Sequence, residues 1–277
     1  MITKKWWLFT GFFIYTTSKV FGQIADVSSV ILESSKPSLL DQNISFDYSS
    51  DRYSKFYDPT HLLLFQYGKK YEWGTGIGRL NYAKRFGKNA YQFETDLYPK
   101  IADGVYCYLN YGLSFSDLFP KHRLGAELFS SLPKSFEASL GLRYLFFDTN
   151  SDVVIYTGSI GYYYGNYWFS LRSFITPSKV SFSRSVGLTV RYYYADADEY
   201  LNFKISGGFS PDERNYDPAN GSVYFLKAQT AGIGWQKPIS ENSILNFSFD
   251  ITNQELGFSN GEYVKVYSFS AGYKYKF

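Results

Sequence analysis

Arginine and carboxylate side chains recur at even spacings in the middle of this chain, a spacing that suits one face of a β-strand. Successive side chains of a strand point to opposite faces, so residues an even number apart share a face. Arg79 and Arg85 would share one face, and Glu94 and Asp96 would share a face of the following segment. Because an Arg guanidinium can bind a carboxylate through two parallel hydrogen bonds, the pattern predicts ion pairs between neighbouring strands.

Residues for catalysis or metal binding are scarce in the sequence. A serine–histidine–acid triad needs a His base beside its nucleophile, and His61 and His122 are the only histidines. Ser114 and Ser116 lie near His122 in sequence, but no nucleophile motif surrounds them. Cys107 is the only cysteine, which excludes an internal disulfide and a cysteine metal site. There is no phosphate loop or dinucleotide fingerprint either, so we expect no catalytic, metal or cofactor-binding residues and no enzyme.

The elements that must position the charges are amphipathic strands. Between Phe136 and Phe146 the even-numbered positions are apolar or aromatic, whereas the odd-numbered ones include Glu137 and Arg143. Similar segments, separated by turn signals, continue to the end of the chain. They predict fourteen strands, with twelve as the alternative, near residues 43–56, 60–73, 76–87, 89–100, 103–116, 121–131, 134–147, 151–165, 166–177, 179–195, 199–210, 222–236, 241–254 and 262–277.

The closing segment indicates which kind of sheet these strands build. From Tyr267 to Phe277 every second residue is apolar or aromatic, and the residues between them are Ser, Gly or Lys. Aromatic residues make up 59 of 277 positions (26 Phe, 28 Tyr and 5 Trp), although the mean hydropathy is only −0.25. Tyrosine suits a membrane interface, and membrane barrels alternate lipid-facing with inward residues. We therefore expect an all-β fold, a transmembrane antiparallel up-and-down β-barrel. A soluble antiparallel sandwich would also alternate, but it does not explain the other signals.

Both ends of the chain fit export to an outer membrane. Lys4 and Lys5 precede an apolar run from Trp6 to Thr17, which is too short for a membrane helix. We expect a signal peptide at 1–22, cleaved after Gly22, a short periplasmic segment at 23–42 and the barrel at 43–277. Tyr273, Tyr275 and Phe277 are expected to form the C-terminal signal for the barrel-assembly machinery.

Orientation and charge limit the partners. If the first strand runs outward, the longest connection, 210–221, lies outside, where barrel loops are usually longer. Without the signal peptide the chain has 25 basic residues against 25 acidic ones, so nothing indicates a nucleic-acid partner. Expected partners are outer-membrane lipid and lipopolysaccharide, and the assembly machinery during insertion.

The inward charges allow two interpretations. The expected network consists of Arg79, Arg85, Glu94, Asp96, Glu137, Arg143, Arg172 and Arg191. In one interpretation it is structural, because buried ions need partners whatever the function. In the other, the five arginines bias a pore toward anionic solutes, as cationic rings do. Both signs of charge occur, and fourteen strands lie between barrels filled by side chains and water-filled porins, so the sequence leaves both open.

The stretch from Trp73 to Tyr194 resembles the YaiO family of outer-membrane β-barrel proteins of Gram-negative bacteria. The matching points are, in order, Arg79 with Asn81, Lys84-Arg85-Phe86-Gly87, Tyr98-Pro99, Phe119-Pro120, Leu132-Pro133, Glu137, Gly141-Leu142-Arg143-Tyr144, Gly165-Asn166-Tyr167-Trp168, Arg172 and Arg191-Tyr192-Tyr193-Tyr194. The resemblance implies an outer-membrane location but no established reaction or cargo. Some members carry a helical-repeat segment before the barrel, as polysaccharide-exporting porins do. Residues 23–41 are too short for one such repeat, which weighs against an export role.

Three functional hypotheses follow. The first is a narrow pore or transport-related barrel with an interior lined by Arg and Glu. The second is a closed structural barrel that supports the envelope or a partner complex. The third and least favoured is an outer-leaflet lipid-modifying enzyme that uses His61 or His122.

Overall fold

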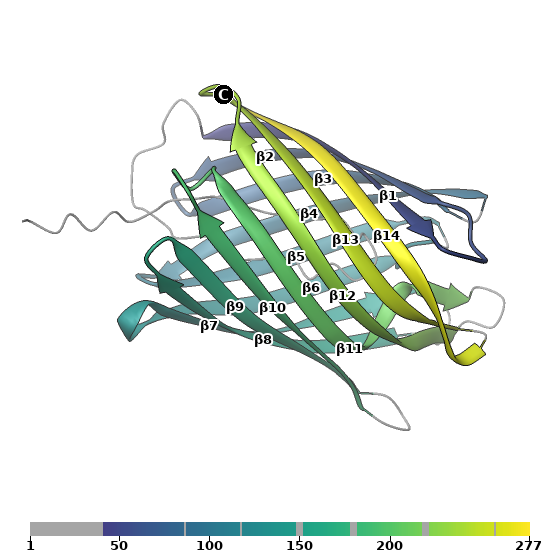
Figure 1. The fold of residues 1–277 in the computed structure, drawn as a ribbon. Helices are drawn as coiled ribbons and strands as arrows, with labels where there is room; N and C mark the ends of the chain where they lie inside the picture. Colours follow the sequence, from purple (N-terminus) through teal and green to yellow (C-terminus); the bar gives the residue numbers. More distant parts are fainter. Residues whose placement is uncertain are drawn as a thin grey trace, which may run out of the picture.

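The computed structural model describes residues 41–85, 87–116, 118–147, 152–177, 182–217, 222–257 and 259–277, and they form a closed antiparallel β-barrel. Figure 1 shows its strands running obliquely around a common axis. The strands are β1 (Gln42–Tyr53), β2 (Thr60–Tyr71), β3 (Gly74–Arg85), β4 (Lys88–Ala102), β5 (Val105–Ser114), β6 (His122–Leu132), β7 (Phe136–Phe146), β8 (Asp152–Tyr164), β9 (Tyr167–Pro177), β10 (Phe182–Tyr193), β11 (Tyr200–Asp217), β12 (Ser222–Pro238), β13 (Ser243–Leu256) and β14 (Ser259–Lys276). The predicted fold class and the count of fourteen are confirmed, and the alternative of twelve is wrong.

Each strand pairs with its neighbours in sequence, and β14 pairs with β1 to close the wall. At this seam Phe46 lies opposite Tyr273. The amide of Gln42 donates to the carbonyl of Phe277 at 3.1 Å, and the amide of Phe277 donates back to Gln42 at 2.9 Å. Closure leaves none of the fourteen described strands with a free edge for pairing with another chain.

The two faces of the wall are inverted relative to a water-soluble protein. Large apolar residues are exposed on the outer face, with Leu140 at 77% and Phe65 at 49%. Polar and charged side chains are buried on the inner face, including Gln92 and Arg191, both at 0%. A sandwich would instead bury its apolar face between two sheets, whereas a membrane barrel turns that face to lipid.

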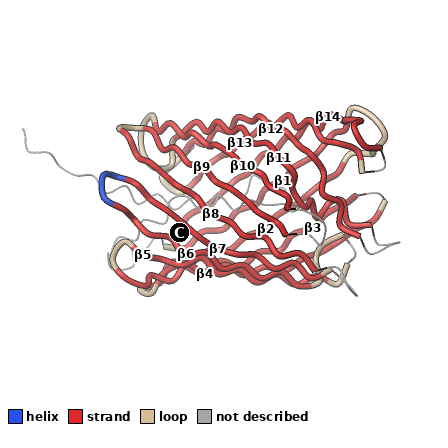
Figure 2. Tube along the Cα trace, turned by 90° about the horizontal axis from the view of Figure 1, so that it is seen from below, coloured by secondary structure: helices blue, strands red, loops and turns tan. Residues whose placement is uncertain are grey.

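Connections lie at the two ends of the barrel, as Figure 2 shows. The end that holds Gln42 and Phe277 has the turns 72–73, 103–104, 165–166, 194–199 and 239–242, and the helical turn η1 (Pro133–Ser135). Gly104 and Gly165 have positive φ angles in two of these turns, as tight turns require. Among the described residues, no helix has the length and apolarity to cross a membrane. The predicted signal peptide lies outside the described residues.

One predicted connection is wrong. Residues 210–217 are not part of a long outer loop but continue β11, where Tyr216 lies opposite Val223 and Asp217 opposite Ser222. The pairing register shifts between Pro211 and Tyr216. Such irregular pairing accommodates a proline, which cannot donate to the strand ladder. The turn-like composition suggested a loop, but pairing across the hairpin overrides that local preference.

Candidate functional site: the inner face of the barrel

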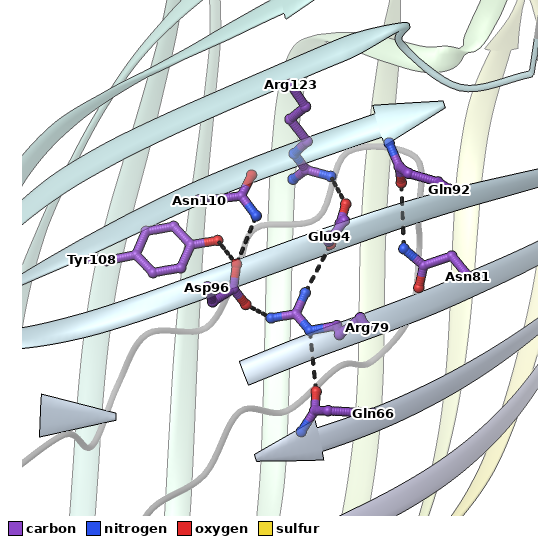
Figure 3. A network of polar contacts seen from close by, with 9 residues as sticks. All are labelled: Gln66, Arg79, Asn81, Gln92, Glu94, Asp96, Tyr108, Asn110 and Arg123. Carbon is purple, nitrogen blue, oxygen red and sulfur yellow. Dashed lines mark hydrogen bonds and ion pairs between the residues drawn. The ribbon is translucent and has the colours of Figure 1, made fainter. Parts of the chain in front are cut away.

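Arg79 on β3 is the centre of a buried polar network (Figure 3). Its Nη1 donates to Glu94 Oε2 at 3.0 Å, its Nη2 pairs with Asp96, and its Nε donates to Gln66 Oε1 at 3.1 Å. Glu94 and Gln66 lie directly opposite Arg79 on β4 and β2. The guanidinium therefore joins three neighbouring strands through side chains as well as through the backbone ladder.

The network continues onto β5 and β6. Asp96 Oδ1 accepts hydrogen bonds from Asn110 Nδ2 at 2.6 Å and from Tyr108 OH at 3.2 Å. Glu94 Oε1 accepts from Arg123 Nη1 at 3.3 Å. The charged side chains of this group are at most 4% exposed. Two arginines face two carboxylates, so the local charge is balanced where desolvation would make an unpaired ion costly.

A second cluster joins β6 to β9. Arg172 Nη1 lies 2.7 Å from Glu127 Oε1, which also accepts a 2.5 Å hydrogen bond from Ser139 Oγ. Arg172 donates further to Thr157 Oγ1 at 3.2 Å and to Ser159 Oγ at 3.3 Å. Its guanidinium thus binds partners on two other strands, β6 and β8.

Glycines on the inner face make room for these side chains. A Cβ on Gly141 would lie 2.6 Å from the Cβ of Glu127 and 2.5 Å from the carbonyl oxygen of Ala126. A Cβ on Gly112 would lie 3.2 Å from the Cβ of Arg123. Glycine therefore occupies the strand positions over which a charged side chain of the neighbouring strand lies.

Aromatic rings surround the other arginines. The Arg191 guanidinium lies 4.4 Å from the ring centre of Tyr200 and 5.2 Å from that of Trp168, and it donates to Tyr193 OH at 3.3 Å. Arg143 lies 5.7 Å from the ring centre of Phe174. A cation over an aromatic face is stabilised by the ring quadrupole, most strongly when both are desolvated.

The remaining residues of the expected network are also buried. Glu137 accepts a 3.4 Å hydrogen bond from Tyr106 OH, and Arg85 lies at the opposite end of β3 from the turn 72–73. The structure thus brings Arg79 together with Glu94 and Asp96. It pairs Arg172 with Glu127, which was not in the expected set.

We call the inner face of β2–β9 the charged wall. The inner face of β10–β14, which we call the small-residue wall, differs in size and exposure. Its partly exposed positions include Ser185, Gly187, Thr189, Ser206, Thr230, Gly232, Ser248 and Ser270. One ion pair of this wall joins Lys204 and Asp250 at 2.9 Å across Gly232, and the Lys204 side chain is 26% exposed. Another joins Lys276 on β14 to Asp198 of the turn 194–199 at 2.5 Å. The interior is therefore lopsided over the middle of the barrel, with long buried side chains on the charged wall and short, more accessible ones on the small-residue wall. Nearer the Phe277 end, the small-residue wall also carries the buried Arg191 and Gln236.

The histidines considered for catalysis lie on the outer face, whereas Ser114 lies on the inner face, with its Oγ 3.1 Å from that of Ser116. His61 and His122 hydrogen-bond through Nδ1 to Tyr48 OH at 2.7 Å and to Tyr111 OH at 3.1 Å. Ser114 is buried and donates to the carbonyl of Tyr91 at 2.7 Å. In the described ranges, no three His, Cys, Asp or Glu residues gather into a possible metal site.

The C-terminal aromatic residues face outward. Tyr273, Tyr275 and Phe277 are 41%, 38% and 39% exposed, and the last two stack with ring centres 6.1 Å apart. They are accessible from the lipid side of the closing strand.

Comparison with solved structures shows the same architecture at low sequence identity. The structure titled "Bacterial polysaccharide outer membrane secretin" gives a TM-score of 0.54 at 9% identity, covering 87% of this chain and 100% of that one. The outer membrane protein Omp33 of Acinetobacter baumannii gives 0.51 at 11% identity, covering 87% and 100%. The anion-selective porin of Comamonas acidovorans gives 0.47 at 10% identity, covering 85% and 98%. These likenesses concern the fold.

Comparison with curated protein sequences gives no match. The model of the YaiO membrane beta barrel domain matches residues 41–213, more than half of the chain and a wider stretch than the motifs from Trp73 to Tyr194. Together with the barrel and its outer-membrane neighbours, this match confirms the resemblance and the outer-membrane location. The chain belongs to the YaiO family of outer-membrane β-barrel proteins.

Proposed function

We propose that this protein is a narrow outer-membrane pore for small hydrophilic solutes, whose passage follows the small-residue wall. The observation that carries the proposal is the lopsided interior. Inner positions such as Thr189, Thr230 and Ser248 are partly exposed, whereas the charged side chains around Arg79 are at most 4% exposed. Short hydroxyl side chains offer hydrogen bonds to a solute and its water while leaving space for both.

Strong anion selectivity from an arginine ring is not part of the proposal. A cationic ring attracts anions when its charge is not already offset. Arg79 contacts Glu94 and Asp96, and Arg172 contacts Glu127. In the small-residue wall, Lys204 is paired with Asp250. We therefore propose weak ion selectivity, set more by the width of the passage than by charge.

A closed structural barrel is the second candidate, and the network of the charged wall favours it. Side-chain bonds join β2 through β6 and then β6 through β9, in addition to the backbone ladders. Such cross-links would stiffen a wall that serves only as a membrane anchor or partner platform. We propose that they instead hold one side of the pore rigid.

Planar-bilayer conductance combined with cysteine accessibility separates the candidates. In a Cys107→Ser background, Thr230→Cys and Ser248→Cys place thiols on the small-residue wall. Ser170→Cys places a matched control on β9, where Ser170 is 6% exposed. We expect small single-channel steps, and a water-soluble cationic thiol reagent should reduce them at the first two positions but not at Ser170.

Two outcomes would count against the proposal. Absence of conductance across the voltage range would favour the closed structural barrel. Equal modification at Ser170 and at Thr230 would mean that the passage does not follow the small-residue wall.

A further inference from the structure

A cationic surface patch crosses the outer face of four neighbouring strands near the end remote from Phe277. Its members are Lys265 on β14, Arg52 on β1, His61 on β2 and Lys84 on β3. Arg52, Lys84 and Lys265 are exposed and His61 is half-buried. We call these four residues the cationic patch.

The strand registers bring the four side chains together. Lys84 lies directly opposite His61, a pairing that puts Cβ atoms about 5 Å apart. Arg52 lies two residues beyond Ser50, which is opposite His61, so Arg52 and His61 are diagonal neighbours. Lys265 is diagonal to Arg52, because Arg52 lies opposite Tyr267. Adjacent members are thus within reach of a shared ligand.

Among the described residues, no carboxylate forms an ion pair with Arg52, Lys84 or Lys265 of the cationic patch. The outward positions of β14, β1, β2 and β3 carry no Asp or Glu; Asp47 and Asp51 of β1 are buried on the inner face. On the neighbouring strand β13, Glu255 is diagonal to Lys265, because Lys265 lies opposite Asn253, and it accepts hydrogen bonds from the amides of Lys227 and Gly261. The Nδ1 of His61 is bound to Tyr48 OH at 2.7 Å, which leaves Nε2 for a ligand.

An apolar belt begins directly beside the cationic patch. Tyr48, Phe65 and Phe269 each lie four residues nearer the barrel middle than Arg52, His61 and Lys265 on the same strands, and they are 40%, 49% and 52% exposed. Cations at the rim above exposed rings and aliphatic groups match an anionic headgroup above its acyl chains. The opposite end holds both ends of the described barrel and mostly short turns, which in outer-membrane barrels is the periplasmic end. The cationic patch therefore lies at the outer leaflet.

We propose that the cationic patch binds the phosphate groups of a phosphorylated glycolipid of the outer leaflet, of the lipid A type. The patch spans three strand spacings, about 14 Å in all, and so can contact phosphates at both ends of a disaccharide headgroup. Arg52 offers a forked donor that suits a phosphate, and Lys84 and Lys265 add point charges on either side. A glycerophospholipid, with a single phosphodiester, would use only part of this set.

Lipid binding to the purified full-length protein in a neutral detergent tests the proposal. Native mass spectrometry would measure the binding of diphosphoryl lipid A, of its dephosphorylated form and of phosphatidylglycerol. The variant Arg52→Gln/Lys84→Gln/Lys265→Gln should bind diphosphoryl lipid A at least tenfold more weakly than the wild type. The control Lys69→Gln/Lys70→Gln/Lys134→Gln removes the same charge at the opposite end and should bind like the wild type.

Several results would overturn the proposal. They are equal binding of the dephosphorylated lipid, tighter binding of phosphatidylglycerol, and an equal loss in the control. Heat-modifiable gel migration checks that each variant is folded. The single variant Arg52→Gln, whose affinity for diphosphoryl lipid A should fall about threefold, keeps the test valid if the triple variant does not fold. Channel conductance should be the same in all of these variants as in the wild type. A failure of the lipid-binding proposal can therefore be told apart from a failure of the pore proposal.

Discussion

The Nη1 of Arg172 on β9 lies 2.7 Å from Oε1 of Glu127 on β6, although β7 and β8 run between these strands. The contact is possible because the wall curves, so that inward side chains converge across the concave face. Gly141, which lies opposite Glu127 on β7, carries no side chain that would block it. The ion pair is thus a consequence of barrel curvature as much as of residue identity.

Removing one partner of this pair should be costly. Arg172→Met leaves the Glu127 carboxylate buried without its cationic partner, although Ser139 still donates to it, and breaking a buried pair typically costs about 3–5 kcal/mol. Urea titration of the protein folded in lipid vesicles measures the loss. The double variant Arg172→Met/Glu127→Gln should recover more than half of it, and equal losses in both variants would contradict the ion-pair explanation.

Gly141 should tolerate no side chain. Gly141→Ala places a Cβ 2.5 Å from a backbone oxygen that cannot rotate away, and overpacking of this kind costs about 1–3 kcal/mol. Gly78→Ala is the matched control, because its Cβ meets nothing within 4 Å. The same urea titration should show little change for Gly78→Ala. Equal effects at the two glycines would mean that general strand propensity, not contact with Glu127, explains the loss.

The outer face should reject charge most strongly at mid-height. Leu140 is 77% exposed in the middle of β7, and an arginine at the bilayer midplane of a barrel costs about 2–4 kcal/mol. Tyr164, 66% exposed at the end of β8, is the control, and arginine near the interface costs about 0–1 kcal/mol. Vesicle-folding equilibria of Leu140→Arg and Tyr164→Arg measure both. A larger cost at Tyr164 would place the membrane elsewhere on the wall.

Ion selectivity should respond to the pair in the small-residue wall. Asp250→Asn removes the carboxylate that pairs with the 26%-exposed Lys204 side chain, which should shift the reversal potential in a KCl gradient toward anions. Lys204→Gln should shift it toward cations. Shifts in the same direction, or none in channels that conduct, would show that permeating ions do not pass this pair.

Assembly in cells should depend on the side chain of Phe277 more than stability does. Its backbone bonds to Gln42 survive in Phe277→Ala, and its ring is 39% exposed to the lipid side. Unaided folding of Phe277→Ala into vesicles should therefore resemble that of the wild type. The amount of folded barrel in cells should fall several-fold. A matching defect in vesicles would assign the ring to stability instead of recognition.

The strands were predictable because their signal is local. Alternation of apolar residues with Glu137 and Arg143 within β7 needs no knowledge of the neighbouring strands. The same alternation predicted that Arg79 and Glu94 face inward on neighbouring strands, and the short hairpin between β3 and β4 sets the register that brings them opposite each other.

The contact between Arg172 and Glu127 and the course of β11 were not predictable in this way. The former joins strands that are not neighbours, so it depends on curvature and on the small residues between them. The latter depends on pairing between Tyr216 and Val223, which overcame the turn-like residues after Ser210. Local residue preferences report neither of these long-range effects.

The seam between Gln42 and Phe277 has a kinetic consequence. These residues begin the first strand and follow the last strand of the described chain, and their pairing is the contact of greatest sequence separation in the barrel wall. Bringing distant segments together carries a loop-closure entropy cost, and contacts of high contact order form slowly. Hairpins such as β3–β4 can form early, while the first and last strands wait with unpaired edges. The protein is therefore most exposed to aggregation just before the ring closes, and a chaperone or insertion catalyst would act to greatest effect at that step.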